Sequence, residues 1–252
     1  MASHRLTGDA DPTWNNQTLK LYAIGDIHGC LHTFDELLDK VFEDIGDDEA
    51  EVILLGDYTD RGPYSFEVIE KIISLLDSNP KVKFTPIRGN HDQMFMDACR
   101  SRSVEMFLHN GGDKTVESYV KNGKDPAFHY AFLSSLPLMI RRGEFLFVHA
   151  GIDPGRKLDD QSEWDCIWER KWQNYDGAFD ENVFVVHGHT PVPNVHRKEN
   201  QMDIDTGCVF RLFYQDESDY GLLTAVRLDG RKDFKFIQVP FNDWPDGRKR
   251  KE

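Results

Sequence analysis

A unit that joins one strand to one helix repeats early in this sequence, and it constrains the fold more than any other feature. Residues 19–26 (LKLYAIGD) form an apolar, strand-like run, and residues 31–45 (LHTFDELLDKVFEDI) then carry apolar side chains at helical spacing. The unit recurs in residues 51–57 (EVILLGD) and 65–80 (SFEVIEKIISLLDSNP), and a third strand is predicted at residues 81–90 (KVKFTPIRGN). Alternating strands and helices predict an α/β fold with parallel pairing in the first half of the chain.

The second half of the chain has a different pattern. Residues 101–136 are predicted to be mostly helical, with a break at 110–112 (NGG), a helix N-cap at Asp113 and a helix stop at Gly123. A strand-rich part follows, in which turn residues separate the strands and favour antiparallel pairing. Its strand-like segments are EFLFVHA, NVFVVHGH, QMDIDTG, LLTAVRLDG and DFKFIQVP.

The chain is predicted to contain one domain, because its 252 residues can bury one substantial core and no internal repeat or long linker divides them. We place this domain at residues 19–241, with a flexible N-terminal extension at 1–18 and a basic C-terminal tail at 242–252. The N-terminal residues lack the basic start and apolar stretch of a signal peptide, and no apolar run approaches the ~18 residues of a membrane span. We therefore expect a cytoplasmic protein without a membrane partner; its oligomeric state is left open.

The formal net charge of −14 disfavours non-specific attraction to nucleic acid, so no nucleic-acid partner is expected. A nuclease is disfavoured further because the sequence lacks a basic groove interleaved with aromatic residues. Any phosphate chemistry must create its own local positive field. The cysteines lie far apart without C-x-x-C spacing, which fits reduced thiols better than disulfides or a zinc cluster. They are Cys30, Cys99, Cys166 and Cys208.

Polar side chains of metal-binding types follow five of the predicted strands. A single Asp or His in such a place is usually a helix cap or a turn residue. In α/β sheets, however, the carboxyl ends of strands form the edge where ligand crevices open, so five such ends together predict one site. The residues concerned are Asp26 and His28, Asp57, Asn90 and His91, His149, and His189.

The chemistry of these side chains predicts two divalent metal ions. Carboxylate and amide oxygens mixed with imidazole nitrogens suit manganese, iron or zinc, whereas calcium prefers a site made of oxygens alone. Of the three metals, we expect manganese. Six candidate ligands also exceed what one tetrahedral ion takes. If Asp57 is shared by both ions, Asp26 and His28 can complete the ligands of the first ion. Two ions bridged in this way typically lie ~3.5–4 Å apart. The second site would contain Asn90, His149 and His189.

Five short motifs occur in a fixed order: GDIHG (25–29), GDYTDRG (56–62), RGNHD (88–92), HAG (149–151) and HGHTP (187–191). Together they resemble the calcineurin-like metallophosphoesterase superfamily, specifically its phosphoprotein-phosphatase group in the bacterial and phage form. The resemblance spans about residues 19–207. It implies a fold in which two β-sheets pack face to face between helices, and it implies the same assignment of the six ligands to two ions.

The resemblance also implies a mechanism and roles for individual residues. A hydroxide bridging the two ions would attack phosphorus in line, without a phosphoenzyme. Arg61 would bind the phosphate, and His91 would be the general acid, oriented by Asp60, whose carboxylate would raise the pKa of the imidazole. The alternative for Asp60 is a cap of the DRG turn. Arg170 in the IWER segment would be the second phosphate-binding arginine. Its alternatives in the same irregular segment are Arg156 and Lys171.

Some positions depart from the pattern of related protein phosphatases. GNHD ends in Asp92 where many relatives have Glu, and Thr59 replaces an aliphatic residue, but neither position is an assigned ligand. GHTP lacks the second histidine of the GHxH form, which leaves three protein ligands for the first ion. His187 is predicted to be a packing residue. Residues 208–221 are longer than a hairpin needs, and we expect them to form a mobile loop near the metals that influences substrate choice.

The leading functional interpretation is a metal-dependent phosphomonoesterase of the serine/threonine protein phosphatase type, whose partner is a phosphorylated protein or a small phosphoester. The alternative is a dinucleoside-tetraphosphate hydrolase, because such enzymes share the metal motifs. The arginine of GDYTDRGP favours the phosphoprotein substrate modestly. A phosphate-binding module without catalysis is disfavoured, since every expected ligand type is present.

Overall fold

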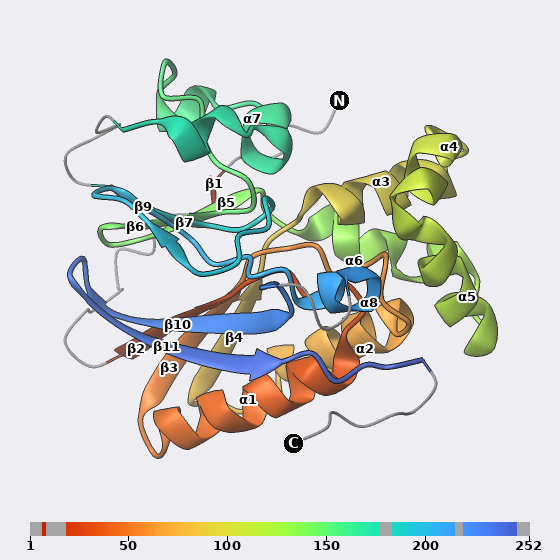
Figure 1. The fold of residues 1–252 in the computed structure, drawn as a ribbon, viewed down its shortest axis with the longest axis horizontal. Coiled ribbons are helices and arrows are strands. Elements are labelled where there is room, and N and C mark those ends of the chain that lie inside the picture. The colour runs from red at the N-terminus through yellow and green to blue at the C-terminus, as the bar shows by residue number, and fades with distance from the viewer. Residues whose placement is uncertain (1–6, 9–18, 177–182, 215–218, 246–252) are drawn as a thin grey trace.

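Two β-sheets pack face to face in the computed structural model, and helices lie on their outer sides (Figure 1). The structure describes residues 7–8, 19–176, 183–214 and 219–245. The first sheet has the strand order β11-β10-β2-β3-β4, and the second has the order β1-β5-β6-β7-β9-β8. This arrangement confirms the predicted α/β fold of two packed sheets flanked by helices.

The first sheet contains the repeated strand–helix units of the sequence. Strands β2, β3 and β4 pair in parallel, as predicted, and helices α1 and α2 make the connections between them. Strand β10 pairs antiparallel with both β2 and β11. The strands are β2 (Leu19–Ile24), β3 (Glu49–Leu54), β4 (Val82–Pro86), β10 (Leu222–Gly230) and β11 (Asp233–Pro240), and the helices are α1 (Leu31–Ile45) and α2 (Ser65–Leu76).

The second sheet corrects the expectation of antiparallel pairing in the later half. Its β5–β6 and β8–β9 pairs are antiparallel, but β6–β7 and β7–β9 are parallel. The chain between β6 and β7 is long enough to return to the starting end of the sheet, which parallel pairing requires. The strands are β1 (Thr7–Gly8), β5 (Met139–Arg142), β6 (Phe145–Val148), β7 (Phe184–His187), β8 (His196–Arg197) and β9 (Gln201–Asp203).

The remaining helices are short. They are α3 (Asn90–Cys99), α4 (Val104–Phe107), α5 (Asp113–Lys121), α6 (Tyr130–Ser135), α7 (Glu163–Trp168) and α8 (Arg211–Tyr214). A π-helical turn, Leu108–Gly112, joins α4 to α5, and 3₁₀ turns occupy Pro126–His129, Leu158–Asp160, Lys171–Asn174 and Cys208–Phe210.

Two predicted helix boundaries have different outcomes. Asp113 is not an N-cap, because Gly112 before it is already helical at φ −67° and ψ −17°. The predicted break is confirmed at Gly111, whose φ of 92° lies outside the helical region. Gly123 ends the helix as predicted: it has φ +64°, and its N–H donates to the Val120 carbonyl at 3.0 Å.

Part of the segment predicted as a mobile loop, 208–221, is helical. The 3₁₀ turn Cys208–Phe210 leads directly into α8, while residues 215–218 lie outside the described residues. The aromatic ring of Phe210 stacks on that of Tyr214 at 5.9 Å between centroids. The loop prediction therefore fails at least as far as Tyr214, because aromatic contacts hold that part in helical turns.

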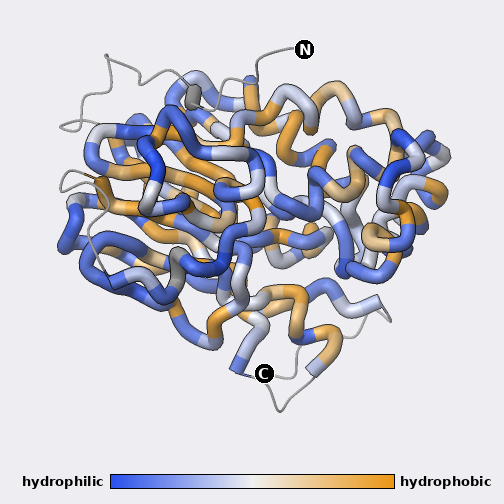
Figure 2. Tube along the Cα trace, turned by 90° about the horizontal axis from the view of Figure 1, so that it is seen from above, coloured by the Kyte–Doolittle hydropathy of each residue, from blue (hydrophilic) through white to orange (hydrophobic). Residues whose placement is uncertain are grey.

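The core has one layer between the sheets and further layers beneath the helices. Along β2, Leu21 and Ala23 face the second sheet, whereas Tyr22 and Ile24 face the helices, which follows from the two-residue repeat of a strand. Both faces of β2 are covered, so the strand is nearly continuously hydrophobic. In Figure 2, hydrophobic residues gather in the interior of the molecule, and much of the outer trace is hydrophilic.

Both described ends of the chain attach to the domain. Thr7–Gly8, within the predicted N-terminal extension, pairs in parallel with β5. Asp243, within the predicted tail, is buried and accepts hydrogen bonds from the main-chain N–H groups of His32 and Thr33 at the start of α1. The packed part of the chain thus continues past residue 241. The rest of the extension and tail, 1–6, 9–18 and 246–252, lies outside the described residues.

Two further expectations concern chemistry rather than topology. The cysteines Cys30, Cys99, Cys166 and Cys208 are free thiols, as predicted. Within the described ranges, no helix combines the length and the apolar character needed to cross a membrane.

Candidate dimetal centre

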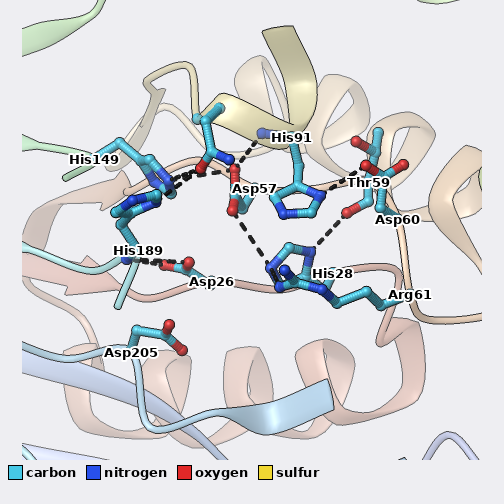
Figure 3. Close-up of polar contacts among 12 residues, drawn as sticks. Asp26, His28, Asp57, Thr59, Asp60, Arg61, His91, His149, His189 and Asp205 are labelled. Atoms are coloured by element: carbon cyan, nitrogen blue, oxygen red, sulfur yellow. Dashed lines mark hydrogen bonds and ion pairs between the residues drawn. The ribbon is translucent and has the colours of Figure 1, made fainter. Parts of the chain in front are cut away.

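The polar residues at the five predicted strand ends meet in one place, at the edge between the two sheets (Figure 3). Each comes within four residues after the end of a strand or from the start of α3, so the carboxyl ends of strands from both sheets contribute. All of these side chains are buried, with residue exposures of 6% or less. They are Asp26, His28, Asp57, Asn90, His91, His149 and His189.

The backbone at this edge is unusual. Five residues here have positive φ angles, a conformation that residues other than glycine adopt only when the surroundings impose it. These are His28 (47°), Asp57 (52°), Asp60 (73°), Arg61 (68°) and His189 (72°). Strain of this kind gathers at sites where side chains must be aimed in a fixed direction.

Asp57 lies at the centre of the cluster. Its Oδ2 is 3.4 Å from Nε2 of His28, and its Oδ1 is 3.4 Å from Nε2 of His149. The Oδ1 atom also accepts the main-chain N–H of His91 at 2.9 Å. Burial opposes ionisation of this carboxyl, but the histidines around it, His149 first, hold the pKa of Asp57 well below its usual range. Each oxygen of Asp57 thus faces a different half of the site.

The second half of the site joins Asn90 to two histidines. Oδ1 of Asn90 is 2.9 Å from Nε2 of His149 and 2.8 Å from Nδ1 of His189. Nδ1 of His149 donates to the Leu55 carbonyl at 2.8 Å, so Nε2 is the ring nitrogen that points into the site. Burial alone would lower the pKa of this imidazole, but the neighbouring Asp57 carboxylate raises it. Atoms that can donate electron pairs to a metal therefore converge here, including oxygens of Asn90 and Asp57.

The first half of the site is built around His28. Its Nδ1 donates to the Thr59 carbonyl at 2.7 Å, which leaves the lone pair on Nε2. Nη1 of Arg61 lies 2.7 Å from this nitrogen. The guanidinium and a metal ion would use the same lone pair, so an ion at His28 would displace the Arg61 head group from this nitrogen.

Asp26 differs in position from the other predicted ligands. Its carboxylate accepts the main-chain N–H of His189 at 3.2 and 3.3 Å. In the described part of the chain, the triads with potential ligand atoms within 4.8 Å of one another are His28, Asp57 and His91, and Asp57, His149 and His189. His91 thus takes the place in the first triad that was predicted for Asp26, and the assignment of Asp26 to the first ion stays a prediction.

The residues fit a pair of divalent cations. Burial, together with the nearby charges of Asp205 and Asp57, raises the pKa of Asp26 well above its usual range. Cations would relieve this repulsion. Among the described residues, Nε2 of His189 is a buried nitrogen without a hydrogen-bond partner, as expected of an atom with its lone pair available to a ligand.

Asp60 contacts His91, as the resemblance to the family implied. Nδ1 of His91 lies 2.7 Å from Oδ2 of Asp60, and the other oxygen of Asp60 accepts from the Thr115 hydroxyl at 2.7 Å. The predicted pKa effect is wrong, however. Burial, with further opposition from Arg61 and Arg170, lowers the pKa of His91 to about 3, and burial raises the pKa of Asp60. Desolvation outweighs the opposing charge of Asp57, so the His91 imidazole is neutral at pH 7, and burial likewise favours the protonated form of Asp60.

The two predicted phosphate-binding arginines lie on opposite halves of the site. Arg61 contacts His28 in the first half. Nη1 of Arg170 donates to the hydroxyl of Thr190, next to His189 in the second half, at 3.2 Å. The positive charge of Arg170 also contributes to lowering the pKa of His189, after burial and the charge of His149.

The alternatives to Arg170 have other surroundings. Arg156 pairs with Asp153 at 3.3 Å and with Asp165 at 2.9 Å, and Asp165 belongs to the capping box of α7. The Lys171 side chain is 90% exposed and lies 3.7 Å from Glu169. Of these three basic side chains, Arg170 is the one that contacts a residue next to a predicted metal ligand, namely Thr190 beside His189.

Two acidic residues with roles in the site were not predicted. Asp92 accepts the main-chain N–H groups of Asp57, Tyr58 and Gly89, each at 2.9 Å, and so holds the turn that carries Asp57. The sequence could have indicated this role, because Asp92 is the third residue of α3, a position from which an acidic side chain often caps the start of a helix. Asp205 is buried beside Asp26, and burial raises its pKa to about 6. Asp205 lies in the segment IDTG, where it does not follow a strand and a glycine as Asp26 and Asp57 do, so the sequence pattern did not point to it.

His187, predicted to be a packing residue, is buried, with Nε2 3.1 Å from Oε1 of Gln201. It does not occur in either triad of potential metal ligands found among the described residues. The histidine belongs to strand β7 and contacts its neighbour strand β9, which agrees with the prediction.

Comparison with known proteins places this site in a family. The family model described as calcineurin-like phosphoesterase matches residues 19–220. The asymmetrical bis(5′-nucleosyl)-tetraphosphatase PrpE of Anoxybacillus flavithermus is 30% identical over 236 residues, which cover 81% of this chain and 88% of that protein. The enzyme of the same name from Bacillus subtilis is 28% identical over 211 residues, covering 74% and 85%.

Solved structures show the same fold at lower identity. A candidate diadenosine tetraphosphatase has a TM-score of 0.62 at 21% identity, covering 91% of this chain and 96% of that chain. The cold-active protein-tyrosine phosphatase of a psychrophilic Shewanella has a TM-score of 0.59 at 18% identity, covering 88% and 81%. With its metal-type ligands at the strand ends and the family model matched from Leu19 to Tyr220, the chain belongs to the calcineurin-like phosphoesterases.

Proposed function

We propose that this protein hydrolyses dinucleoside tetraphosphates. The observation that carries the proposal is the extent of the similarity to proteins named bis(5′-nucleosyl)-tetraphosphatase, which covers 81% of this chain and 88% of the Anoxybacillus flavithermus protein. A likeness confined to the motifs would support only a phosphoesterase. The alternative interpretation of the sequence is therefore favoured over the leading one, a serine/threonine protein phosphatase.

The positions of the two arginines support a substrate with several phosphates. Arg61 lies at His28 and Arg170 at the His189 side, so a guanidinium is available on either side of the central carboxylate of Asp57. Planar guanidinium groups form paired hydrogen bonds with phosphate oxygens. They also give the site a local positive charge in a chain whose formal net charge is −14.

The chain's ligands are suited to bind two divalent ions. Asp57 would be shared, His28 with Asp26 would hold one ion, and the other would be held by Asn90, His149 and His189. When bound, such ions would supply Lewis acidity to the phosphoryl group and lower the pKa of the attacking water. The carbonyls of Thr59 and Leu55 fix the ring orientation of His28 and His149.

His91 is proposed to donate a proton to the leaving oxygen. Asp60 holds the Nδ1 side of the ring, so Nε2 is the nitrogen that remains for the substrate. The imidazole is neutral here because burial and the arginines disfavour its charged form. A bound polyphosphate would oppose the arginine charges and thereby raise the pKa of His91 toward the donor form.

A parallel substrate assay tests the function. The full chain, reconstituted with Mn²⁺, is assayed on diadenosine tetraphosphate, a phosphoserine peptide and an aryl phosphate. We expect kcat/KM to be highest for diadenosine tetraphosphate and the activity to disappear with a chelator. A kcat/KM for the phosphopeptide above that for the dinucleotide would overturn the proposal and restore the protein-phosphatase interpretation.

A further inference from the structure

A pocket of about 380 Å³ opens beside Arg61, between the π-helical turn Leu108–Gly112 and the segment that contains α8. Its volume is in the range of sites that bind small molecules. Its lining combines aromatic rings with polar side chains and one cation. The lining includes Arg61, His109, Asn110, Asp113, Phe210 and Phe213.

Arg61 connects this pocket to the reaction site. Its Nη1 is 2.7 Å from Nε2 of His28, and its guanidinium carbon lies 5.3 Å from the centre of the Phe210 ring. The main chain of Arg61 is fixed as well, because its N–H donates to the Gly111 carbonyl at 3.0 Å. A group attached to a phosphate that is bound by Arg61 would therefore reach the pocket directly.

The aromatic residues at the pocket are arranged for stacking. Phe213, which lines the pocket, is 57% exposed, and Tyr214, which follows it but is not part of the lining, is 55% exposed, although both are large and hydrophobic. The ring of Phe210 contacts both, with centroid distances of 6.2 Å to Phe213 and 5.9 Å to Tyr214. Exposed rings that are held by their neighbours offer a flat apolar surface at small entropic cost, and stacking on such rings is a general way to bind a nucleobase.

The polar side of the pocket complements this surface. His109, Asn110 and Asp113 can donate and accept hydrogen bonds along the edge of a base. Asn110 is held in position because its Nδ2 donates to the Met106 carbonyl at 2.8 Å. The pocket therefore combines an exposed aromatic ring, a polar edge and a cation next to the reaction site.

We propose that this pocket binds one nucleoside of the substrate, with the base against Phe213 and Phe210 and its phosphate on Arg61. This inference rests on the proposed function, and it names the part of the chain that selects nucleotides over other phosphoesters. The reacting phosphate itself is handled by the metal-type ligands of the buried centre, whereas the pocket contributes affinity only for phosphates that carry a base.

Equilibrium binding to the full chain tests the pocket without catalysis. Adenosine 5′-monophosphate and inorganic phosphate are titrated separately by calorimetry into the wild type and into Phe213→Ala, Phe213→Trp and Phe128→Ala. We expect Phe213→Ala to weaken binding of the nucleotide by about 5- to 150-fold, the range for loss of one stacked base, and to leave phosphate binding unchanged. Phe213→Trp should retain nucleotide binding.

Phe128→Ala is the matched control, because Phe128 is 52% exposed and does not line this pocket. Its nucleotide affinity should equal that of the wild type. Wild-type nucleotide affinity in Phe213→Ala, or an equal loss for nucleotide and phosphate, would overturn the proposal.

The substrate assay separates failure of this inference from failure of the proposed function. If diadenosine tetraphosphate is the best substrate but Phe213→Ala binds the nucleotide normally, only the pocket assignment is wrong. If Phe213→Ala slows a phosphoserine peptide and leaves nucleotide binding intact, the pocket serves peptide side chains and the inference is wrong for that reason.

Discussion

At the scale of single residues, the segment around Asp57 combines several functions. Its carboxylate faces both halves of the site, while the carbonyls of Leu55 and Thr59, two residues before and after it, accept from His149 and His28. One short stretch thus supplies a shared ligand and orients two histidines. The positive φ of Asp57, 52°, belongs to this turn, and the Asp92 carboxylate holds it through two main-chain N–H groups.

Two roles are open to His91 at this scale, because its position also allows it to approach a metal with His28 and Asp57. We predict that His91→Asn retains both ions and lowers kcat by about 10²–10⁴ on phenyl phosphate, with a smaller loss on p-nitrophenyl phosphate, whose leaving group needs little protonation. Metal content by mass spectrometry and kcat on both esters are measured together.

The same experiment decides between the roles. Loss of one ion in His91→Asn would make His91 a ligand. An equal loss of kcat on the two esters would contradict proton donation even with both ions retained.

At the scale of secondary-structure elements, the site depends on close contact between the end of β3 and the junction of β4 with α3. Gly89 lies at this junction with φ −97° and ψ 174°, which any residue can adopt. Its importance is therefore one of space. A Cβ added there would overlap the carboxylate and main-chain nitrogen of Asp57. The absence of a side chain lets α3 bring Asn90 and His91 against Asp57.

Gly89→Ala tests this contact. We predict that the substitution displaces Asp57, lowers the bound metal content and reduces activity, because Asp57 is shared by both halves of the site. Metal content and kcat are the measurements. Gly155→Ala is the control, since a Cβ there meets only the Asp153 carboxylate, at 3.2 Å. Full metal content in Gly89→Ala would show that the junction can shift without cost to the site.

At the scale of the whole molecule, one buried ion pair joins the two sheets. Glu51 in β3 accepts from Nε and Nη2 of Arg142 in β5 at 2.8 and 2.9 Å, and from the hydroxyl of Thr85 at 2.7 Å. Both charged side chains are almost fully buried. Burial alone would raise the pKa of Glu51, but these hydrogen bonds lower it. The pair therefore helps to set how the sheets lie against each other.

Removing Arg142 should have a large effect that depends on pH. We predict that Arg142→Ala lowers the free energy of unfolding by about 3–5 kcal/mol at pH 7, because it leaves the buried Glu51 charge without its buried partner. The cation that remains near it is Lys83, 3.4 Å away and 58% exposed, which is a weaker partner. The lowered pKa of Glu51 stabilises the wild type above the ordinary pKa of Glu, and this contribution is lost as pH falls. The deficit of the variant should therefore shrink in acid, where Glu51 becomes protonated.

Urea unfolding of the wild type and of Arg142→Ala at pH 7 and pH 4 measures the difference in their free energies of unfolding at each pH. The double variant Glu51→Leu/Arg142→Met, which replaces both charges with apolar groups, should recover most of the lost stability at pH 7. A deficit in Arg142→Ala that is the same at both pH values would show that lost packing, not the unpaired charge, is responsible.

Features that depend on local pattern could be predicted from the amino-acid sequence alone. The alternation of strand and helix predicted the first sheet, and the polar residues at the strand ends predicted which side chains meet at its edge. These predictions succeed because hydrophobic periodicity and glycine-containing turns act over a few residues. The contact of His91 with Asp60 was also predicted, from the resemblance to the family.

Features that depend on contacts between distant segments could be seen only in the folded molecule. Parallel pairing of β6 with β7, the place of Asp26 against the His189 main chain, and the pocket beside Arg61 bring together segments far apart in the chain. The low pKa of His91 belongs here too. A carboxylate neighbour can be expected from a motif, but the desolvation that outweighs it arises only when the whole fold closes around the ring.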